Sequence, residues 1–177
     1  MEVFQGRPAD VTGRLEKEIA VYDLLDQLDI PFRRVDHDHA DTMEMCQEID
    51  QALGQDICKN LFLCNRQKTK FYLLLMPGSK PFKTKDLSAQ IGSSRLSFGG
   101  PEDMERLLHL TPGSVTVLGL MYDPDCQVTL LIDQDLYQQT AFGCHPCINT
   151  STVQFSTADL REKLLPALGH TVTLVQL

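Results

Sequence analysis

The chain has 177 residues, of which 42% are hydrophobic and 23% are charged. This is enough for one domain with its own core, so we predict a single domain over residues 1–177, with residues 1–12 as a peripheral N-terminal segment. No apolar run approaches the roughly 20 residues that cross a bilayer, and the start of the chain lacks the pattern of a secretory signal. The sequence therefore predicts a cytoplasmic protein with no membrane partner.

The net charge of −8 is distributed unevenly along the chain. Residues 57–100 hold eight basic residues and one acidic residue, a net charge of +7, whereas the rest of the chain carries −15. A negative total argues against a nucleic-acid partner, but a local excess of positive charge suits a surface that faces phosphate groups. Lysines on solvated loops produce the same pattern, so both interpretations stay open.

Two of the six cysteines, Cys144 and Cys147, have the C-x-x-C spacing of a redox or metal-binding pair. A redox pair usually lies at the start of a helix that follows a strand. Here residues 148–155 instead predict a turn that leads into a strand. We therefore expect free thiols, with Cys58 and Cys64 acting as small core residues.

The first part of the chain predicts two helices around a short strand. Apolar residues recur at helical spacing over Thr12–Leu28, and residues 32–36 suit a strand. A second helix is expected over Thr42–Leu53, with Thr42 as its N-cap and Gly54 as its stop.

The remainder predicts strands in pairs, with helices between the pairs. We expect a hairpin from residues 58–64 and 70–76, a second strand pair from 115–120 and 127–132, and single strands at 151–155 and 171–176. Helices are expected at 87–91, at 101–110 and, capped by Thr157, at 157–168. This order favours a mixed α/β (α+β-like) fold with a central, mostly antiparallel sheet surrounded by helices.

Lys59 and Asn60 form the first pair of candidate site residues, at the start of an apolar strand. A lysine offers three donors to a phosphate or carbonyl, and an asparagine both donates and accepts. An edge lysine that extends to solvent is the structural alternative.

Two turns supply further candidates. In Thr111–Thr116, Gly113 leaves room for a substrate near the backbone, whose N–H groups can hold an oxyanion or a water. In Gly143–Pro146, His145 is held between a glycine and a proline, which suits a residue that orients a water or hydroxyl. Such turns are common, and a lone histidine is more often structural.

His37 and His39 would point to the same face if they lay on a strand, as some metal sites require. No third ligand is suitably spaced, so we expect no metal. The sequence also contains no nucleophile elbow, P-loop or dinucleotide fingerprint.

The candidate motifs occur together in a recognisable order: Cys58–Leu63, Arg95–Phe98, Thr111–Thr116, and Gly143–Pro146 followed by Asn149–Val153. In this order they resemble the YbaK/prolyl-tRNA-synthetase-associated editing domains, and most of all the free-standing ProX-type branch, which deacylates alanyl-tRNA(Pro). The resemblance covers about residues 15–176.

The resemblance implies a partly barrel-like sheet and a trans-editing hydrolase that needs no cofactor and no metal. Lys59, Asn60, Gly113 and His145 match the catalytic positions of the family, with Lys59 expected to anchor the terminal adenosine phosphate or the substrate. Ser114, Thr116, Gly143 and Arg95 are the expected substrate-binding residues. The chain departs from the family at Val117, where the loop ends in proline in other members.

The implied partner is the acceptor end of a mischarged tRNA, and prolyl-tRNA synthetase is a second candidate. An aminoacyl ester is already activated, so positioning a water supplies much of the catalysis without a serine or cysteine nucleophile. Such an editor is needed because a proline pocket cannot strongly exclude the smaller alanine. Three alternatives stay open: the same reaction on another mischarged tRNA such as cysteinyl-tRNA(Pro), a non-catalytic tRNA- or synthetase-binding module, and a thiol or metal protein.

Overall fold

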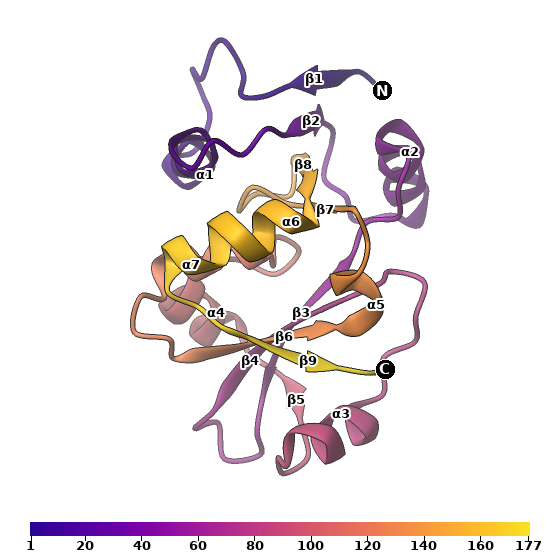
Figure 1. Cartoon of the computed structure of the whole chain (residues 1–177), viewed down its shortest axis with the longest axis vertical. Helices are drawn as coiled ribbons and strands as arrows, with labels where there is room; N and C mark the ends of the chain where they lie inside the picture. Colours follow the sequence, from indigo (N-terminus) through magenta and orange to yellow (C-terminus); the bar gives the residue numbers. More distant parts are fainter.

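The computed structural model describes residues 1–177 and contains two β-sheets arranged one above the other along the long axis of the molecule (Figure 1). The upper, four-stranded sheet has the order β1 (Val3–Gln5), β2 (Arg33–Asp36), β8 (Ser151–Ser156) and β7 (Ala141–Cys144). The lower, five-stranded sheet has the order β5 (Ser97–Phe98), β3 (Lys59–Cys64), β4 (Phe71–Met76), β6 (Val128–Asp133) and β9 (Val172–Val175).

Most strand pairs are antiparallel, and only β4–β6 and β6–β9 are parallel. The predicted fold class, a mixed α/β fold with mostly antiparallel pairing, is confirmed. The barrel-like detail is wrong, because both sheets are open and each has two edge strands.

The helices cover the ends and the middle of this arrangement (Figure 1). Helices α1 and α2 flank the upper sheet, and α3 lies at the lower end. A continuous helical stretch of α6, η2 and α7 crosses between the sheets. Their bounds are α1 (Glu16–Gln27), α2 (Met43–Leu53), α3 (Thr84–Ile91), α4 (Pro101–Leu108), η1 (Val117–Tyr122), α5 (Gln134–Tyr137), α6 (Thr157–Asp159), η2 (Leu160–Leu164) and α7 (Leu165–Leu168). None of these helices combines the length and the apolar character that crossing a membrane requires.

One large hydrophobic core joins the two sheets. Phe142 and Phe155 of the upper sheet belong to the same buried cluster as Phe62, Leu73 and Leu130 of the lower sheet. A smaller cluster lies on the other face of the lower sheet, under α3. The sheets are therefore packed on shared side chains and do not form separate cores.

The helix predicted over residues 42–53 is confirmed together with its caps. The Thr42 hydroxyl accepts a hydrogen bond from the Met45 N–H at 3.2 Å, and Gly54 ends the helix with φ +69°. The first helix starts later than predicted, at Glu16 and not at Thr12, because Gly13 adopts φ +80° and turns the chain.

The strand predicted at residues 115–120 is wrong. Val117–Tyr122 forms the 3₁₀ helix η1, whose first four residues are buried and whose start is capped by the Thr116 side chain. An apolar run that is buried on every side has no periodicity to distinguish a strand from a helix. The second strand of the predicted pair, β6, instead pairs in parallel with β4 and β9.

The last helix is capped by Ser156 and not by Thr157, because the Ser156 hydroxyl accepts the Asp159 N–H at 3.0 Å while Thr157 is buried. This helix contains a widened π-helical turn, Leu160–Leu164, which ends two residues before Pro166. A widened turn accommodates a proline, which has no N–H to donate. Three short strands, β1, β5 and β7, were not predicted, and β1 extends the upper sheet by pairing with β2.

Candidate active site

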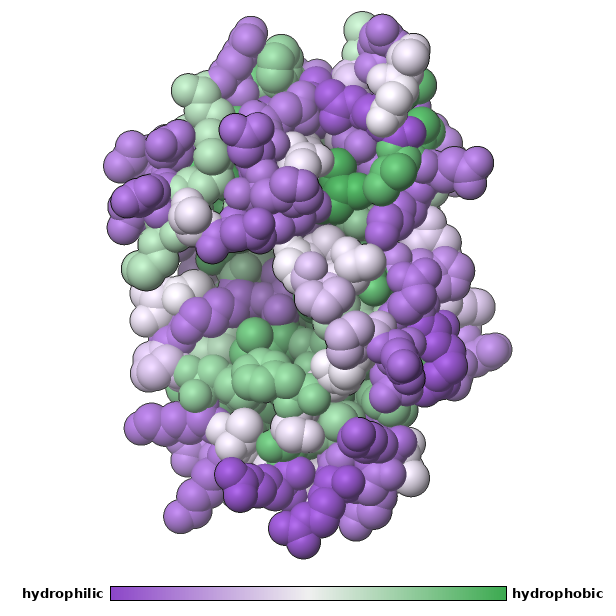
Figure 2. Space-filling view, turned by 180° about the vertical axis from the view of Figure 1, so that it is seen from behind, coloured by the Kyte–Doolittle hydropathy of each residue, from purple (hydrophilic) through white to green (hydrophobic).

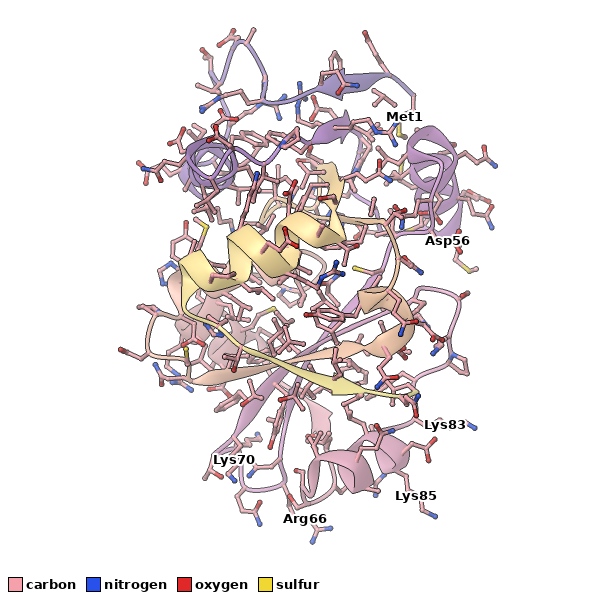
Figure 3. The ribbon with its side chains drawn as sticks, in the orientation of Figure 1. Met1, Asp56, Arg66, Lys70, Lys83 and Lys85 are labelled. Atoms are coloured by element: carbon pink, nitrogen blue, oxygen red, sulfur yellow. The ribbon has the colours of Figure 1, made fainter.

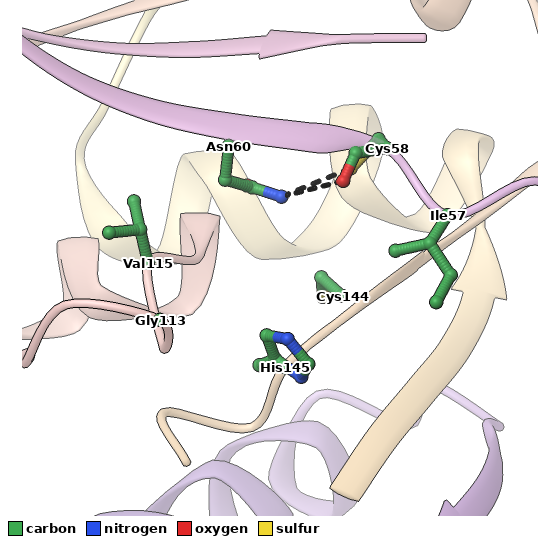
Figure 4. Close-up of a pocket in the computed structure, with 7 residues that line it drawn as sticks. All are labelled: Ile57, Cys58, Asn60, Gly113, Val115, Cys144 and His145. Atoms are coloured by element: carbon green, nitrogen blue, oxygen red, sulfur yellow. Dashed lines mark hydrogen bonds between the residues drawn. The ribbon is translucent and has the colours of Figure 1, made fainter. Parts of the chain in front are cut away.

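A small pocket lies where β3, the loop before η1 and the end of β7 meet (Figure 4). Its volume is about 170 Å³, and it is lined by Ile57, Cys58, Asn60, Gly113, Val115, Cys144 and His145. Three of the four predicted catalytic residues, Asn60, Gly113 and His145, are therefore brought together from distant parts of the chain. The fourth, Lys59, does not line this pocket.

Lys59 and Asn60 are separated by the alternation of side chains along β3. Consecutive residues of a strand point to opposite faces of the sheet, and Asn60 faces the large core with Phe62 whereas Lys59 does not. The Lys59 ammonium donates to the Lys80 carbonyl and lines a second, larger pocket of about 570 Å³. The two pockets are neighbours, because both are lined by Ile57, Cys58 and His145.

His145 has a defined protonation state in this pocket. Its Nδ1 lies 2.8 Å from the carbonyl oxygen of Ser151, and a carbonyl only accepts, so Nδ1 carries the proton. Burial lowers the pKa of His145 below its usual 6.5, and the neighbouring His37 ring lowers it further. At neutral pH the ring is therefore uncharged, and its Nε2 is an acceptor.

Asn60 presents an unpartnered acceptor on the other side of the pocket. Its Nδ2 donates to the carbonyl and thiol of Cys58, at 3.3 and 3.2 Å, which fixes the orientation of the amide. The Oδ1 is then buried without any hydrogen-bond partner. A buried polar atom of this kind costs free energy until a donor reaches it, so it marks a position for a ligand N–H or O–H. Figure 4 shows Asn60 and His145 on opposite sides of the pocket.

Gly113 holds its loop in a conformation that favours glycine, with φ +91°. A Cβ there would lie 3.2 Å from the Asn149 Nδ2, which is tighter than ordinary packing. The same Nδ2 donates to the Asp41 carboxylate at 2.9 Å. Asn149 thus ties the loop after β2 to the wall of the pocket beside Gly113.

Two of the residues that line the pocket, Cys58 and Cys144, have thiols that stay protonated. Burial raises the pKa of Cys58 to about 12 and that of Cys144 well above its usual value. Cys58 donates to the Gly143 carbonyl at 3.4 Å. At neutral pH these side chains act as small, uncharged groups, and with Ile57 and Val115 they give the pocket an apolar wall.

A partly buried ionic network supports the carbonyl that orients His145. Asp36 and Ser151 are opposite each other on β2 and β8, and the Ser151 hydroxyl shares its proton between the Asp36 carboxylate at 3.0 Å and the Val35 carbonyl at 3.1 Å. Asp36 is held in turn by Arg14 and Arg34, and the burial that would raise its pKa is outweighed by these two arginines, which lower it to about 2. The network therefore keeps a permanent negative charge next to Ser151.

The expected substrate-binding residues have different environments. Ser114 and Thr116 are buried and hold the loop, since the Ser114 hydroxyl donates to the Thr111 carbonyl at 2.8 Å and Thr116 caps η1. Gly143 lies within β7, just before the pocket residues of that strand. Arg95 is apart from all of these and lines a separate hollow beside α3. Val117, at the position of the departure from the family, is fully buried at the start of η1.

The structure does not assemble the alternative metal or redox sites. The strand β2 ends at Asp36, so His37 and His39 do not lie on a strand; His37 contacts the Thr152 hydroxyl, whereas His39 lines a different pocket. No group of three or more His, Cys, Asp or Glu side chains is arranged to hold a metal ion. All six cysteines are free, and both Cys144 and Cys147 are buried.

Three residues around the pocket were not singled out from the sequence: Asn149, Ser151 and Ile57. Asn149 and Ser151 lie in the run that carried the family resemblance, so a signal was present. Their roles depend on the pairing of β2 with β8, which the local sequence does not reveal.

Comparison with known proteins agrees with this architecture. Residues 37–163 match the family model described as the aminoacyl-tRNA editing domain, and the chain therefore belongs to that family. It is 32% identical over 163 residues to the "Prolyl-tRNA editing protein ProX" of Acetoanaerobium sticklandii. This alignment covers 92% of this chain and 99% of that protein. It is 28% identical to "Prolyl-tRNA synthetase associated domain-containing protein 1" of Danio rerio, over 93% of this chain and 86% of that protein.

A solved structure described as a candidate trans-editing enzyme for prolyl-tRNA synthetase has the same fold. Its TM-score is 0.65 at 17% sequence identity, and the match covers 92% of this chain and 98% of that one. The likeness at this identity concerns the fold and not the substrate.

Proposed function

We propose that this protein hydrolyses the ester bond of a mischarged aminoacyl-tRNA in trans, with alanyl-tRNA(Pro) as its main substrate. The family of the chain and the ProX relative support the deacylase activity. The observation that carries the assignment of the site is the pairing of two unused acceptors, His145 Nε2 and Asn60 Oδ1, on one small pocket beside Gly113.

The aminoacyl group fits this pocket by its chemistry. The α-ammonium group of an amino acid is a strong donor and would satisfy the buried Asn60 Oδ1. A small side chain would then contact the apolar wall of Ile57, Cys58 and Val115. The volume of about 170 Å³ is well below the roughly 300–1,000 Å³ of typical ligand pockets, so the pocket suits a small group.

Hydrolysis follows from the position of His145. The neutral ring accepts a hydrogen bond through Nε2 from a water or from the ribose hydroxyl next to the ester. As the oxygen of the water attacks the ester carbonyl, Nε2 takes a proton from that water. The bond to the ribose oxygen then breaks, and the proton on Nε2 passes to the ribose oxygen as it leaves. Backbone groups of the Gly113 loop lie beside the pocket and can stabilise the negative charge that develops on the carbonyl oxygen.

Lys59 would act on the nucleotide and not on the amino acid. Its ammonium has three N–H groups, of which the Lys80 carbonyl takes one, so donors remain for a phosphate. The pocket of about 570 Å³ that Lys59 lines is large enough for a nucleoside and adjoins the small pocket. Ser114, Thr116 and Gly143 would contribute by shaping the walls that the ester contacts.

A small pocket explains why an editing enzyme complements a synthetase. A missing methylene is worth only about 1–3 kcal/mol in a binding site, so a proline pocket admits alanine, and a second pocket sized for the smaller group removes the error. Cysteinyl-tRNA(Pro) is the second candidate substrate, because cysteine is also small. Prolyl-tRNA synthetase is a further proposed partner, and a cytoplasmic location follows from a tRNA substrate.

We treat residues 1–177 as one editing domain, because one core cluster joins both sheets. Residues 1–12 are its proposed peripheral segment, which adds the edge strand β1 to the upper sheet.

Deacylation of a panel of mischarged tRNAs tests the proposed function. We expect fastest hydrolysis of alanyl-tRNA(Pro), slower hydrolysis of cysteinyl-tRNA(Pro), and none of prolyl-tRNA(Pro). Lys59→Ala should lower the rate strongly, while Lys163→Ala is the matched control, since Lys163 also donates to a backbone carbonyl but lies outside both pockets. An unchanged rate in Lys59→Ala would disprove the assigned site, and tRNA binding without any turnover by the wild type would favour a binding module.

A further inference from the structure

The basic side chains of the chain divide into two groups by their contacts. Ten of the sixteen donate to a carboxylate, an amide or a backbone carbonyl of the protein. The other six make no hydrogen bond or ion pair through their side chains: Arg66, Lys68, Lys70, Lys83, Lys85 and Arg95. All six are exposed. The lysine and arginine side chains without a hydrogen-bond or ion-pair partner thus all lie within residues 66–95.

These six residues also lie together in space, at the lower end of the molecule. Arg66, Lys68 and Lys70 belong to the turn between β3 and β4, while Lys83, Lys85 and Arg95 lie at or next to α3. Figure 3 shows Arg66, Lys70, Lys83 and Lys85 extending outward from this end, and Figure 2 shows hydrophilic side chains along the same end from behind. We call this surface, defined by the six residues, the basic end.

The composition of the basic end suits a ligand that carries repeated negative charges. Its only carboxylate between residues 57 and 100 is Asp86. Thr84, Lys85, Ser88 and Arg95 line a hollow of about 410 Å³ that contains no hydrophobic residue. Cations that have no ion-pair partner do not stabilise the fold through pairing, but they can neutralise phosphates and release counterions.

The basic end is separate from the pocket but connected to it. Asn60 lies near the start of β3 (Lys59–Cys64), and Arg66 lies in the turn after its end, so the two are separated by about 13 Å of extended strand from Asn60 to Cys64 and by the turn itself. The larger pocket is lined by Gly78 and Ser79, and the chain then runs through Lys83 and Lys85 to α3. A nucleic acid whose 3′ end enters the pockets would therefore continue along this segment toward the basic end.

We propose that the basic end binds the sugar-phosphate backbone of the tRNA beyond its 3′-terminal nucleotides, and so supplies affinity that the small pocket alone does not. This inference rests on the proposed function, since it assumes that the ligand is an RNA. It assigns Arg95 to the RNA backbone and not to the aminoacyl group. Contacts of this kind position the RNA without reading its sequence.

The test compares two double variants with the same net charge. Lys83→Gln/Lys85→Gln removes two charges of the basic end, whereas Arg7→Gln/Lys163→Gln removes two charges that are paired with Asp23 and Asp159 outside the basic end. For full-length mischarged tRNA, we expect the first variant to lose about tenfold in kcat/KM, mostly through a higher KM. A plot of the logarithm of the tRNA-binding constant against the logarithm of salt concentration should also become less steep, by about one for each lost phosphate contact. The second variant should behave as the wild type.

A short substrate separates the basic end from the pocket. With an aminoacyl ester on the terminal CCA trinucleotide, all three proteins should hydrolyse at the same rate. Equal kcat/KM of both variants on full-length tRNA would overturn the proposal, and so would a loss in Lys83→Gln/Lys85→Gln that is as large on the trinucleotide.

Direct binding keeps the proposal testable if the proposed function fails. Uncharged full-length tRNA is titrated against each protein at several salt concentrations. Weaker binding by Lys83→Gln/Lys85→Gln alone supports the basic end even when the wild type hydrolyses nothing. Unchanged tRNA binding, combined with lost binding of prolyl-tRNA synthetase, would assign the surface to a protein and overturn the proposal.

Discussion

Arginine and lysine residues have contrasting environments at the two ends of the molecule. In the upper half, Arg14 and Arg34 pair with Glu18 and Asp36 in a partly buried network. At the basic end, six exposed cations have no partner. Charges that stabilise the fold are thus placed where burial strengthens them, and charges without a structural role are left in solvent, where they remain available to a ligand.

The largest expected effect is on the upper network. Arg34 is 4% exposed, pairs with Asp36 and lies over the Phe4 ring, so Arg34→Met leaves a half-buried carboxylate with one partner fewer. We expect the free energy of unfolding to fall by about 3 kcal/mol, as for other broken buried pairs. Urea denaturation measures it, and Lys83→Met at the basic end should change it by less than about 0.5 kcal/mol. If Arg34→Met and Lys83→Met lowered the free energy of unfolding equally, the arginines of the upper half would stabilise the fold no more than the cations of the basic end.

The next effect concerns catalysis. His145→Ala removes the acceptor Nε2 and should lower kcat about 100-fold with little change in KM. The wild-type rate should fall as the pH drops through the lowered pKa of His145, because the protonated ring can no longer accept a proton. The variant should lack this dependence, while His109→Asn, at an exposed histidine outside the pocket, should keep both the rate and the pH profile.

A smaller effect is the pH dependence of stability. The pKa of Asp36 is about 2 in the folded protein and near 3.8 when unfolded, so its contribution is present above pH 3.8 and is lost as the pH falls toward 2. With allowance for partial exposure, we expect about 1–2 kcal/mol. The difference in unfolding free energy between the wild type and Asp36→Asn should therefore shrink over this interval. A difference that is constant with pH would show that Asp36 is not ionised through this network.

The smallest effect is at the pocket loop. Gly113→Ala and Gly92→Ala both place a Cβ at positive φ, which costs about 1 kcal/mol, but only the Cβ at position 113 meets a neighbour, Asn149. Both variants should unfold at slightly lower urea concentration. Only Gly113→Ala should also lose activity, about tenfold if the loop shifts by a fraction of an ångström. Equal activity of the two variants would show that the contact with Asn149 has no part in the site.

The sequence predicted those features of the fold that depend on local chemistry. The caps of α2 at Thr42 and Gly54, and the hairpin of β3 and β4, follow from residues close together in the chain. The η1 segment was not predictable in this way, because its side chains are buried on every side and their pattern has no period.

For the site, the local motifs identified Asn60, Gly113 and His145 but not their arrangement. The separation of Lys59 from Asn60 follows from strand alternation, although the two residues are adjacent in the motif. The support of His145 by Ser151 and Asp36 depends on the register of β2 and β8, which are more than a hundred residues apart in sequence.

The buried thiols beside the pocket have a consequence for the fate of the substrate. An aminoacyl ester is reactive enough to acylate a thiolate, and such an attack would leave the amino acid attached to the enzyme as a thioester. The raised pKa values of Cys58 and Cys144 keep both sulfurs protonated at neutral pH. The burial that makes them packing residues thus also protects the enzyme from self-acylation, so that water remains the acceptor of the acyl group.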